Sequence, residues 1–239
     1  MIAYNAGAQS VYVGGEINDK ATVWKNGTPT ILATGSSDIF SVVVDNGNVY
    51  AAGYEFDEVS GKFVAKLWKN NEEKYAISGD ISPEDGHTMI SSVAVSGNDV
   101  YMVGVKDGVG KVWKNGVEEP GYTNAKAVYS VLISGDKIFA AGSTTSGAAV
   151  VWENGDLLYT LTADTYLINE AHSIAMDDNG DLYTAAYGWI ADGIGNGKWL
   201  HTVSKNDAVL YTLGTIGTNS KHGLGLYRDK RKKRKGSGN

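Results

Sequence analysis

Two short motifs recur five times along the chain, and this repetition constrains the fold more than any other feature of the sequence. In the first, a small residue follows an aromatic one by three positions: V-Y-V-G-G from Val11, N-V-Y-A-A-G from Asn48, D-V-Y-M-V-G from Asp99, K-I-F-A-A-G from Lys137 and D-L-Y-T-A-A from Asp181. The copies of the second are T-V-W-K-N-G from Thr22, K-L-W-K-N-N from Lys66, K-V-W-K-N-G from Lys111, V-V-W-E-N-G from Val150 and T-V-S-K-N-D from Thr202. The tryptophans Trp24, Trp68, Trp113 and Trp152 are 44, 45 and 39 residues apart, and Ser204 takes the fifth place. Repeats of this length indicate a repeat architecture.

The pattern of each unit predicts four short strands. In four units, apolar runs that begin with serine precede the aromatic motif, at residues 41–44, 92–95, 130–133 and 173–176. Asn, Asp and Gly residues such as Asn46-Gly47 follow these runs, and the second motif ends in Asn-Gly or a similar pair, so each unit holds two hairpin turns. A four-stranded antiparallel unit repeated near this length predicts an all-β fold, a five-bladed β-propeller.

The units fill residues 1–227, which we expect to form a single propeller domain, and residues 228–239 form a basic tail. The first unit has only a degraded inner strand, Ile2-Ala3-Tyr4, whereas the segment from His222 to Leu226 aligns with that from His172 to Met176. We expect the C-terminal segment to insert as an inner strand of the first blade and close the ring. Truncation at residue 216 would then lower the stability.

The V-Y-x-A-G and W-K-N-G motifs resemble those of uncharacterised bacterial and phage-type β-propeller repeat proteins. The resemblance spans residues 1 to about 216 and is specific for the repeat. It implies a propeller fold and carries no assigned chemistry.

Composition and charge limit the kinds of partner that the chain is expected to bind. The chain has no cysteine, which excludes disulfides and thiolate chemistry, and no apolar run long enough to span a membrane. Residues 228–235 hold seven basic residues and one acid, which leaves residues 1–227 with 14 basic and 26 acidic residues and a net charge of −12. Nucleic acid is therefore not expected to bind the folded body. The basic tail is expected to be a solvated charge run, with docking to an anionic surface as the alternative.

One face of the propeller carries loops that vary in length from unit to unit, and such loops typically form binding sites. The longest are expected at residues 54–62 and 187–198, between the second and third strands. The loops that lead into each inner strand lie on the same face. Aromatic rings beside carboxylates suit glycan or peptide recognition. The predicted ligand-binding residues are Tyr54, Phe56, Tyr129, Tyr166, Glu170, Tyr187, Trp189 and Trp199.

Other chemistry has weaker support in the sequence. His87, His172 and His222 each precede an inner strand. Because only three of the five units have such a histidine and their spacing is unequal, no metal or cofactor is predicted. Acids that a glycosidase would need are present in loops rather than in the cores of inner strands: Asp38, Glu84, Asp85, Asp164 and Glu170. The glycine-rich stretch 192–197 matches neither a calcium loop nor a phosphate loop. No catalytic residue is assigned.

The sequence thus predicts a non-catalytic module, expected to be monomeric, that binds a glycan or protein partner. The alternatives are a glycan-cleaving enzyme with acids at the axial funnel and a structural component of a phage or surface assembly. An extracellular, cell-surface or virion setting is favoured over the cytoplasm.

Overall fold

The computed structural model describes residues 2–5, 10–80, 87–161, 167–191 and 197–216, and the regular structure within them is β-strand. Twenty strands form five four-stranded sheets, which we call blades one to five in chain order. The strands are, in blade one, β1 (Ile2–Asn5), β2 (Ser10–Glu16), β3 (Ala21–Lys25) and β4 (Thr28–Ile31); in blade two, β5 (Ser37–Asp45), β6 (Asn48–Asp57), β7 (Lys62–Lys69) and β8 (Glu72–Ser78); in blade three, β9 (Met89–Ser96), β10 (Asp99–Lys106), β11 (Val109–Lys114) and β12 (Val117–Glu118); in blade four, β13 (Ala125–Ser134), β14 (Lys137–Thr144), β15 (Ala149–Glu153) and β16 (Asp156–Thr160); and in blade five, β17 (Leu167–Met176), β18 (Leu182–Ala191), β19 (Gly197–Lys205) and β20 (Ala208–Ile216).

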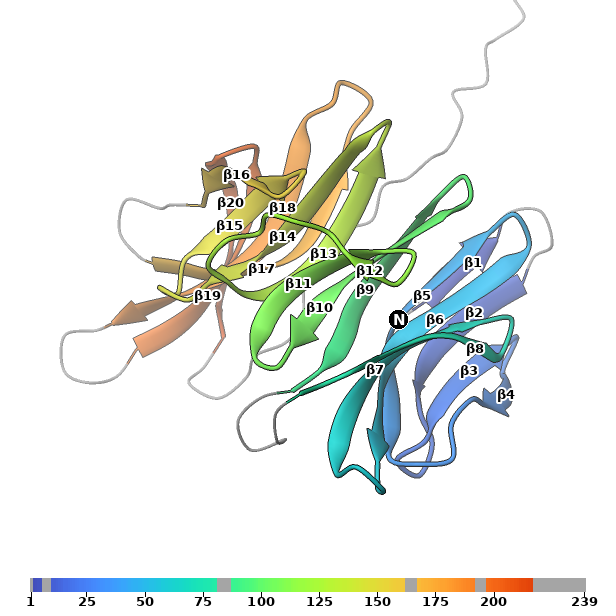
Figure 1. The fold of residues 1–239 in the computed structure, drawn as a ribbon. Helices are drawn as coiled ribbons and strands as arrows, with labels where there is room; N and C mark the ends of the chain where they lie inside the picture. Colours follow the sequence, from blue (N-terminus) through green and yellow to red (C-terminus); the bar gives the residue numbers. More distant parts are fainter. Residues whose placement is uncertain (1, 6–9, 81–86, 162–166, 192–196, 217–239) are drawn as a thin grey trace, which may run out of the picture.

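In every blade, consecutive strands are antiparallel neighbours. The blades follow one another in chain order and meet through their first strands, since β5 packs against β9, β9 against β13 and β13 against β17 (Figure 1). This arrangement is propeller-like, and it confirms the predicted all-β fold of five four-stranded antiparallel units. Closure of a ring between blades one and five is not shown by the described residues.

The asparagine of the second motif holds each blade together in the same way. Its φ lies between 51° and 54° in all five blades, the left-handed conformation that a tight hairpin turn needs. Its side-chain Oδ1 accepts a hydrogen bond, 2.8 to 3.0 Å long, from the backbone N–H just before the aromatic residue of the first motif. Its own backbone N–H donates to the carbonyl of that same residue. The five asparagines are Asn26, Asn70, Asn115, Asn154 and Asn206. The turn between the third and fourth strands is thereby fastened to the start of the second strand.

Substitutions of Asn115 separate these two contributions. Asn115→Gly keeps the left-handed turn and removes the acceptor for Val100 N–H, so we expect it to lower the free energy of unfolding by about 1 kcal/mol. Asn115→Ala also places a residue that disfavours positive φ in the turn, so the expected loss is about 2 kcal/mol. Urea denaturation followed by circular dichroism measures both. Two variants as stable as the wild type would contradict this role.

A β-bulge interrupts the first strand of blades two to five at the same place. The unpaired residues are Phe40, Ser91, Tyr129 and His172. In blades two, three and four the bulge brings a backbone carbonyl against the glycine that ends the first motif. A Cβ on Gly53, Gly104 or Gly142 would lie 1.9, 2.0 or 2.1 Å from a carbonyl oxygen. The motif glycine therefore leaves room for the bulged strand in these three blades, whereas Ala186 takes its place beside the bulge of blade five.

The first strands are longer than the sequence predicts, and the loops are correspondingly shorter. The apolar runs predicted strands from residues 41, 92, 130 and 173, whereas β5, β9, β13 and β17 begin three to six residues earlier. Because the bulge shifts the alternation of side chains by one residue, the residues before it do not continue the apolar pattern. The predicted loops 54–62 and 187–198 are also largely strand, since β6, β7, β18 and β19 extend into them.

The motif tryptophans fill the interfaces between blades. Trp68, Trp113 and Trp152 are at most 2% exposed, and each packs in a cluster that contains residues of the preceding blade. Trp24, in blade one, is only half-buried. Ser204, in the fifth position, is fully buried, and its hydroxyl finds no hydrogen-bond partner among the described residues.

Blade one has an inner strand of its own, because β1 pairs with β2 from Ile2 opposite Val13 to Asn5 opposite Ser10. The place beside β2 that the sequence assigned to the C-terminal segment is thus taken by β1. The segment 222–226 and the tail 228–239 lie outside the described residues, so ring closure by that segment stays a prediction.

Candidate functional site

The predicted ligand-binding residues that the structure describes lie in strands rather than in loops. Tyr54 and Phe56 are in β6, Tyr129 in β13, Glu170 in β17, Tyr187 and Trp189 in β18, and Trp199 in β19. Tyr166 lies outside the described residues. The expectation that the candidate acids lie outside the inner strands is wrong for two of them, because Asp38 is in β5 and Glu170 is in β17. The bulges concealed both from the sequence pattern.

Five rings from blades four and five form a continuous row, which we call the aromatic row. Tyr129 stacks on His172 with ring centroids 4.2 Å apart, and His172 stacks on Tyr187 at 5.0 Å. Tyr187 meets Trp199 edge-on at 5.1 Å, and Trp199 meets Trp189 at 5.0 Å. Two of these rings, Tyr129 and His172, are the bulge residues of adjacent blades. The bulges therefore bring together, across the blade interface, side chains that are 43 residues apart in the sequence.

Glu170 is the hydrogen-bonding centre of this row. Its Oε2 accepts a bond from the Tyr187 hydroxyl and lies 3.0 Å from His172 Nε2. Burial raises the pKa of Glu170, but hydrogen bonds from His172, Tyr187 and Tyr129 outweigh it and lower the pKa to about 2. The carboxylate is thus ionised throughout the neutral range and fixed in position by three neighbours.

The neighbours of Glu170 are polarised by it. Burial, together with the Glu170 charge and hydrogen bond, raises the pKa of the Tyr129 and Tyr187 hydroxyls, so both stay protonated and donate. Because an ionised carboxylate only accepts, His172 Nε2 carries the proton of their bond. The arrangement offers a fixed negative charge and ring surfaces side by side.

The lowered pKa makes the stability contribution of Glu170 depend on pH. Because the folded value lies below the usual 4.5, the stabilisation is fully present above pH 4.5 and is lost as the pH falls toward 2. Glu170→Gln cannot ionise, so we expect the variant to be less stable than wild type at neutral pH and the difference to shrink between pH 4.5 and 2. Parallel urea titrations of the two proteins measure this difference, because acids elsewhere titrate equally in both. A gap that is unchanged at pH 2.5 would contradict the assignment.

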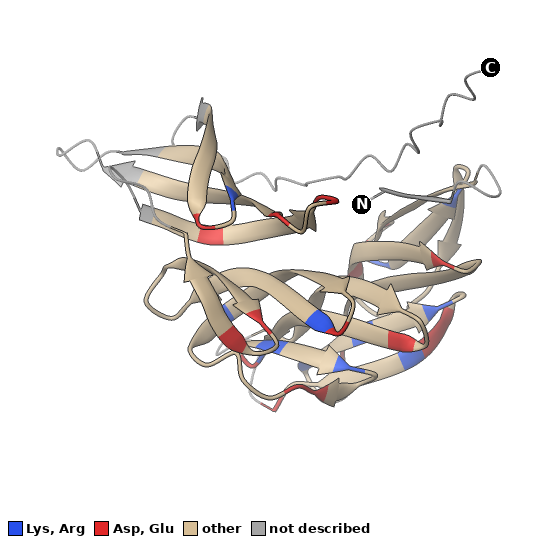
Figure 2. Ribbon diagram, turned by 90° about the horizontal axis from the view of Figure 1, so that it is seen from above, with Lys and Arg blue, Asp and Glu red and all other residues tan. Residues whose placement is uncertain are grey.

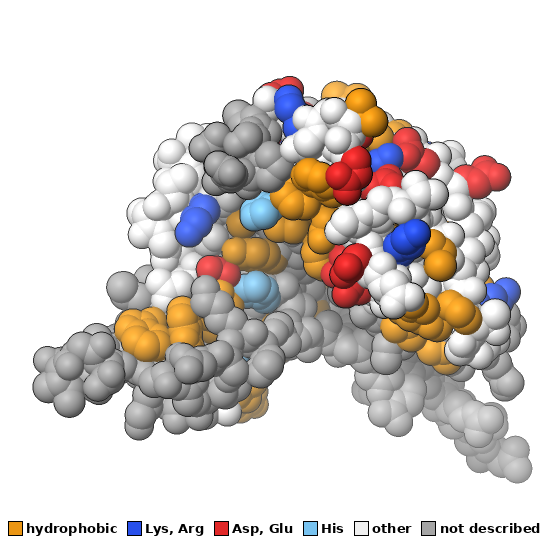
Figure 3. Space-filling view, turned by 90° about the horizontal axis from the view of Figure 1, so that it is seen from below, with side chains coloured by type: hydrophobic (Ala, Val, Ile, Leu, Met, Phe, Trp, Pro, Cys, Tyr) orange, Lys and Arg blue, Asp and Glu red, His pale blue; other side chains and the backbone are white. Residues whose placement is uncertain are grey.

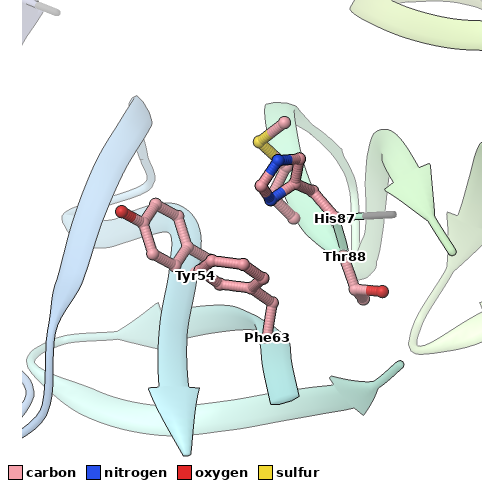
Figure 4. A pocket seen from close by; sticks show the side chains of 5 residues that line it. Tyr54, Phe63, His87 and Thr88 are labelled. Atoms are coloured by element: carbon pink, nitrogen blue, oxygen red, sulfur yellow. The ribbon is translucent and has the colours of Figure 1, made fainter. Parts of the chain in front are cut away.

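Tyr54 and Phe56 belong to a separate cluster in blade two. The Tyr54 ring contacts Phe40 and Phe63, and Phe63 contacts Phe56 and His87. A pocket of about 210 Å³ lies here, between blades two and three, lined by Tyr54, Phe63, His87, Thr88 and Met89 (Figure 4). We call it the blade-two pocket. The sequence did not single out Phe63, whose position just inside a predicted third strand gave no signal of its own.

The other candidates do not assemble into a site. His87 contacts Phe63 of blade two, whereas His172 belongs to the aromatic row of blades four and five, and His201 is buried in β19. Among the described residues no three histidine, aspartate or glutamate side chains are placed to hold a metal. His222, Glu84, Asp85, Asp164 and residues 192–196 lie outside the described part of the chain.

Charge is dispersed over the blades. Within the described residues all basic side chains except histidine are lysines, and several pair with acids, as Lys66 does with Glu55 at 3.3 Å and Lys106 with Asp80 at 2.7 Å. The lysines are spread along the ribbon instead of forming one patch (Figure 2). On the face seen from below, hydrophobic side chains, histidines and acids occur together near the centre (Figure 3). The part of the chain with defined placement also contains no helix with the length and apolar character needed to cross a membrane.

The fold and the site together define an all-β repeat protein of propeller-like blades, with an aromatic and carboxylate cluster on the first strand of blade four and the first three strands of blade five. No protein-family model and no curated protein matches the chain. Among solved structures it is similar to a Thermus thermophilus protein described as an oxidoreductase (glucose dehydrogenase), with 13% identity and a TM-score of 0.48 over 91% of this chain and 83% of the other. It is also similar to an exo-1,5-α-L-arabinanase from a bovine ruminal metagenomic library, with 10% identity and a TM-score of 0.43 over 84% and 91%.

Proposed function

We propose that the protein is a non-catalytic recognition module that binds a glycan at the aromatic row. The observation that carries the proposal is the position of Glu170, an ionised and only partly exposed carboxylate that is held by Tyr187 and His172 and is connected through the Tyr187 ring to the ring pair Trp199 and Trp189. A protein partner presenting hydroxyl and apolar groups is the other ligand class compatible with this chemistry.

Glycans combine the two features that this cluster complements. The C–H faces of a sugar ring pack on aromatic side chains, and its hydroxyls donate to fixed acceptors. A carboxylate makes stronger bonds to hydroxyls than a neutral acceptor does, and Glu170 is oriented before any ligand arrives. Trp189 and Trp199 are both partly exposed.

A glycan array or affinity electrophoresis on polysaccharides tests the proposal. We expect Trp199→Ala and Trp189→Ala to weaken binding by about thirtyfold each, the usual cost of truncating an aromatic anchor. Glu170→Gln is expected to weaken it by about tenfold, since the charge is lost and the shape is kept. Tyr211→Ala is the matched control, because Tyr211 is an aromatic residue of the same blade that is 59% exposed on the outer strand β20. Binding that survives all three site variants, or that the control abolishes equally, would refute the site.

Glycan cleavage is the second candidate, and the placement of Glu170 in an inner strand favours it. The lowered pKa suits a base or nucleophile but not a general acid, which must be protonated at working pH. Polysaccharide turnover that Glu170→Gln abolishes would replace the binding proposal with this one.

A further inference from the structure

The walls of the blade-two pocket are ring faces set at steep angles to one another. Tyr54 and Phe63 meet at 81° with centroids 5.3 Å apart, and Phe63 and His87 meet at 55° and 4.9 Å. Figure 4 shows Tyr54 and Phe63 on one side of the pocket and His87 on the other. Phe40 and Phe56 contact the first two rings and support them. The three rings form a concave aromatic corner shared by β6, β7 and His87, which lies two residues before β9.

The pocket offers few hydrogen bonds to a ligand. Thr88, which is 1% exposed, already accepts a bond from Asp107 N–H at 3.1 Å. The Tyr54 hydroxyl points away from His87 (Figure 4). Phe63 and Met89 have no side-chain donors. The His87 ring nitrogens are the remaining polar atoms of this lining, and they are too few to pair with all the hydroxyls of a polyhydroxylated ligand, whereas a group without donors or acceptors loses no hydrogen bonds on entry.

The charge near the pocket is negative. Asp38 lies opposite Tyr54 in the pairing of β5 with β6. After burial, the charges of Asp38, Glu16 and Asp19 raise the pKa of Tyr54, and no ion pair within the described residues neutralises these three acids. On the other side, Lys106 pairs with the Asp80 carboxylate at 2.7 Å, whereas Lys62 donates to the Asp80 carbonyl at 2.9 Å and keeps its charge, so the three acids outnumber the one unpaired lysine. A bound positive charge is therefore favoured over a neutral group of the same shape.

We propose that the blade-two pocket binds a methylated ammonium group, the cation that combines an apolar surface with a positive charge and is held by aromatic faces. Free choline-type compounds and trimethyllysine side chains share this chemistry. The site is separate from the aromatic row and does not depend on the glycan proposal.

The test compares choline with 3,3-dimethyl-1-butanol, which has the same shape without the charge. Isothermal titration calorimetry on the full chain should show choline binding about tenfold more tightly, within the range of a cation on aromatic faces. Phe63→Leu and His87→Ala should each weaken choline binding severalfold. Asp38→Asn should narrow the preference for choline over the neutral analogue. His87 is exposed, so its variant keeps the test valid if Phe63→Leu fails to fold.

Three outcomes would overturn the proposal. Equal affinity for choline and the alcohol would identify a merely apolar pocket, absence of choline binding would identify no site, and loss of choline binding in Glu170→Gln would place the cation at the aromatic row. Where choline binds, phosphocholine and a trimethyllysine peptide distinguish the two sources. The surrounding acids should repel the phosphate and so weaken the binding of phosphocholine relative to that of choline, whereas they should not weaken the binding of the peptide.

Discussion

Gly104→Ala is expected to unfold the protein or to destabilise it by about 4 kcal/mol or more, a loss of the size that severe overpacking causes. A Cβ at this position would lie 2.0 Å from the Met89 carbonyl oxygen and 3.0 Å from the Ile90 Cα, both of them backbone atoms of the bulged strand β9. Neither can move without breaking the pairing of β9 with β10. Circular dichroism and urea denaturation measure the effect.

Gly15→Ala is the matched control, because Gly15 ends the same motif in blade one. The pairing of β1 with β2 ends at Ile2 opposite Val13 and has no bulge, and among the described residues a Cβ on Gly15 would meet Trp24 ring carbons at 3.5 and 3.8 Å, an ordinary contact. We expect this variant to fold with nearly wild-type stability. Equal damage from both substitutions would show that the motif glycine serves something other than the bulge.

Trp152→Ala is expected to lower the free energy of unfolding by about 3 to 5 kcal/mol, as for other fully buried tryptophans. The side chain is 1% exposed and packs with Tyr101, Val103 and Val112 of blade three, and its ring contacts Tyr122 edge-on at 6.1 Å. Thermal or urea unfolding followed by circular dichroism gives the value. A loss below about 1 kcal/mol would contradict the role of Trp152 as the filler of this interface.

Trp24→Ala supplies the comparison, since Trp24 is half-buried and no preceding blade is shown to cover it. The expected loss is about 1 to 2 kcal/mol. In a closed ring, blade five would cover Trp24 as blade three covers Trp152. A loss as large as that of Trp152→Ala would therefore report closure of the ring in solution.

The units are visible as repeats in the sequence because every blade uses the same turns and the same interface contacts. The Asn-Gly turns, the clamp made by Asn115 and its equivalents, and the tryptophan at each interface depend on contacts that repeat, so they leave a repeating trace in the sequence. The residues of the aromatic row do not recur from blade to blade, so they form no repeating pattern in the sequence. Glu170 and His172 appeared to be loop residues because a bulge offsets the side-chain alternation of β17, and only the inner apolar run kept a regular pattern.

By itself, therefore, the sequence determined the number of units, their four strands, the turns between them and the recurring position of the motif tryptophans, since these follow from local preferences repeated at a nearly fixed spacing. It also identified most of the aromatic residues that now form clusters. Only the tertiary structure decided that these residues form two groups, since blade packing stacks Tyr129 on His172 and sets His87 against Phe63. The charge state of Glu170 was likewise decided there, because it depends on hydrogen bonds from residues of three different strands.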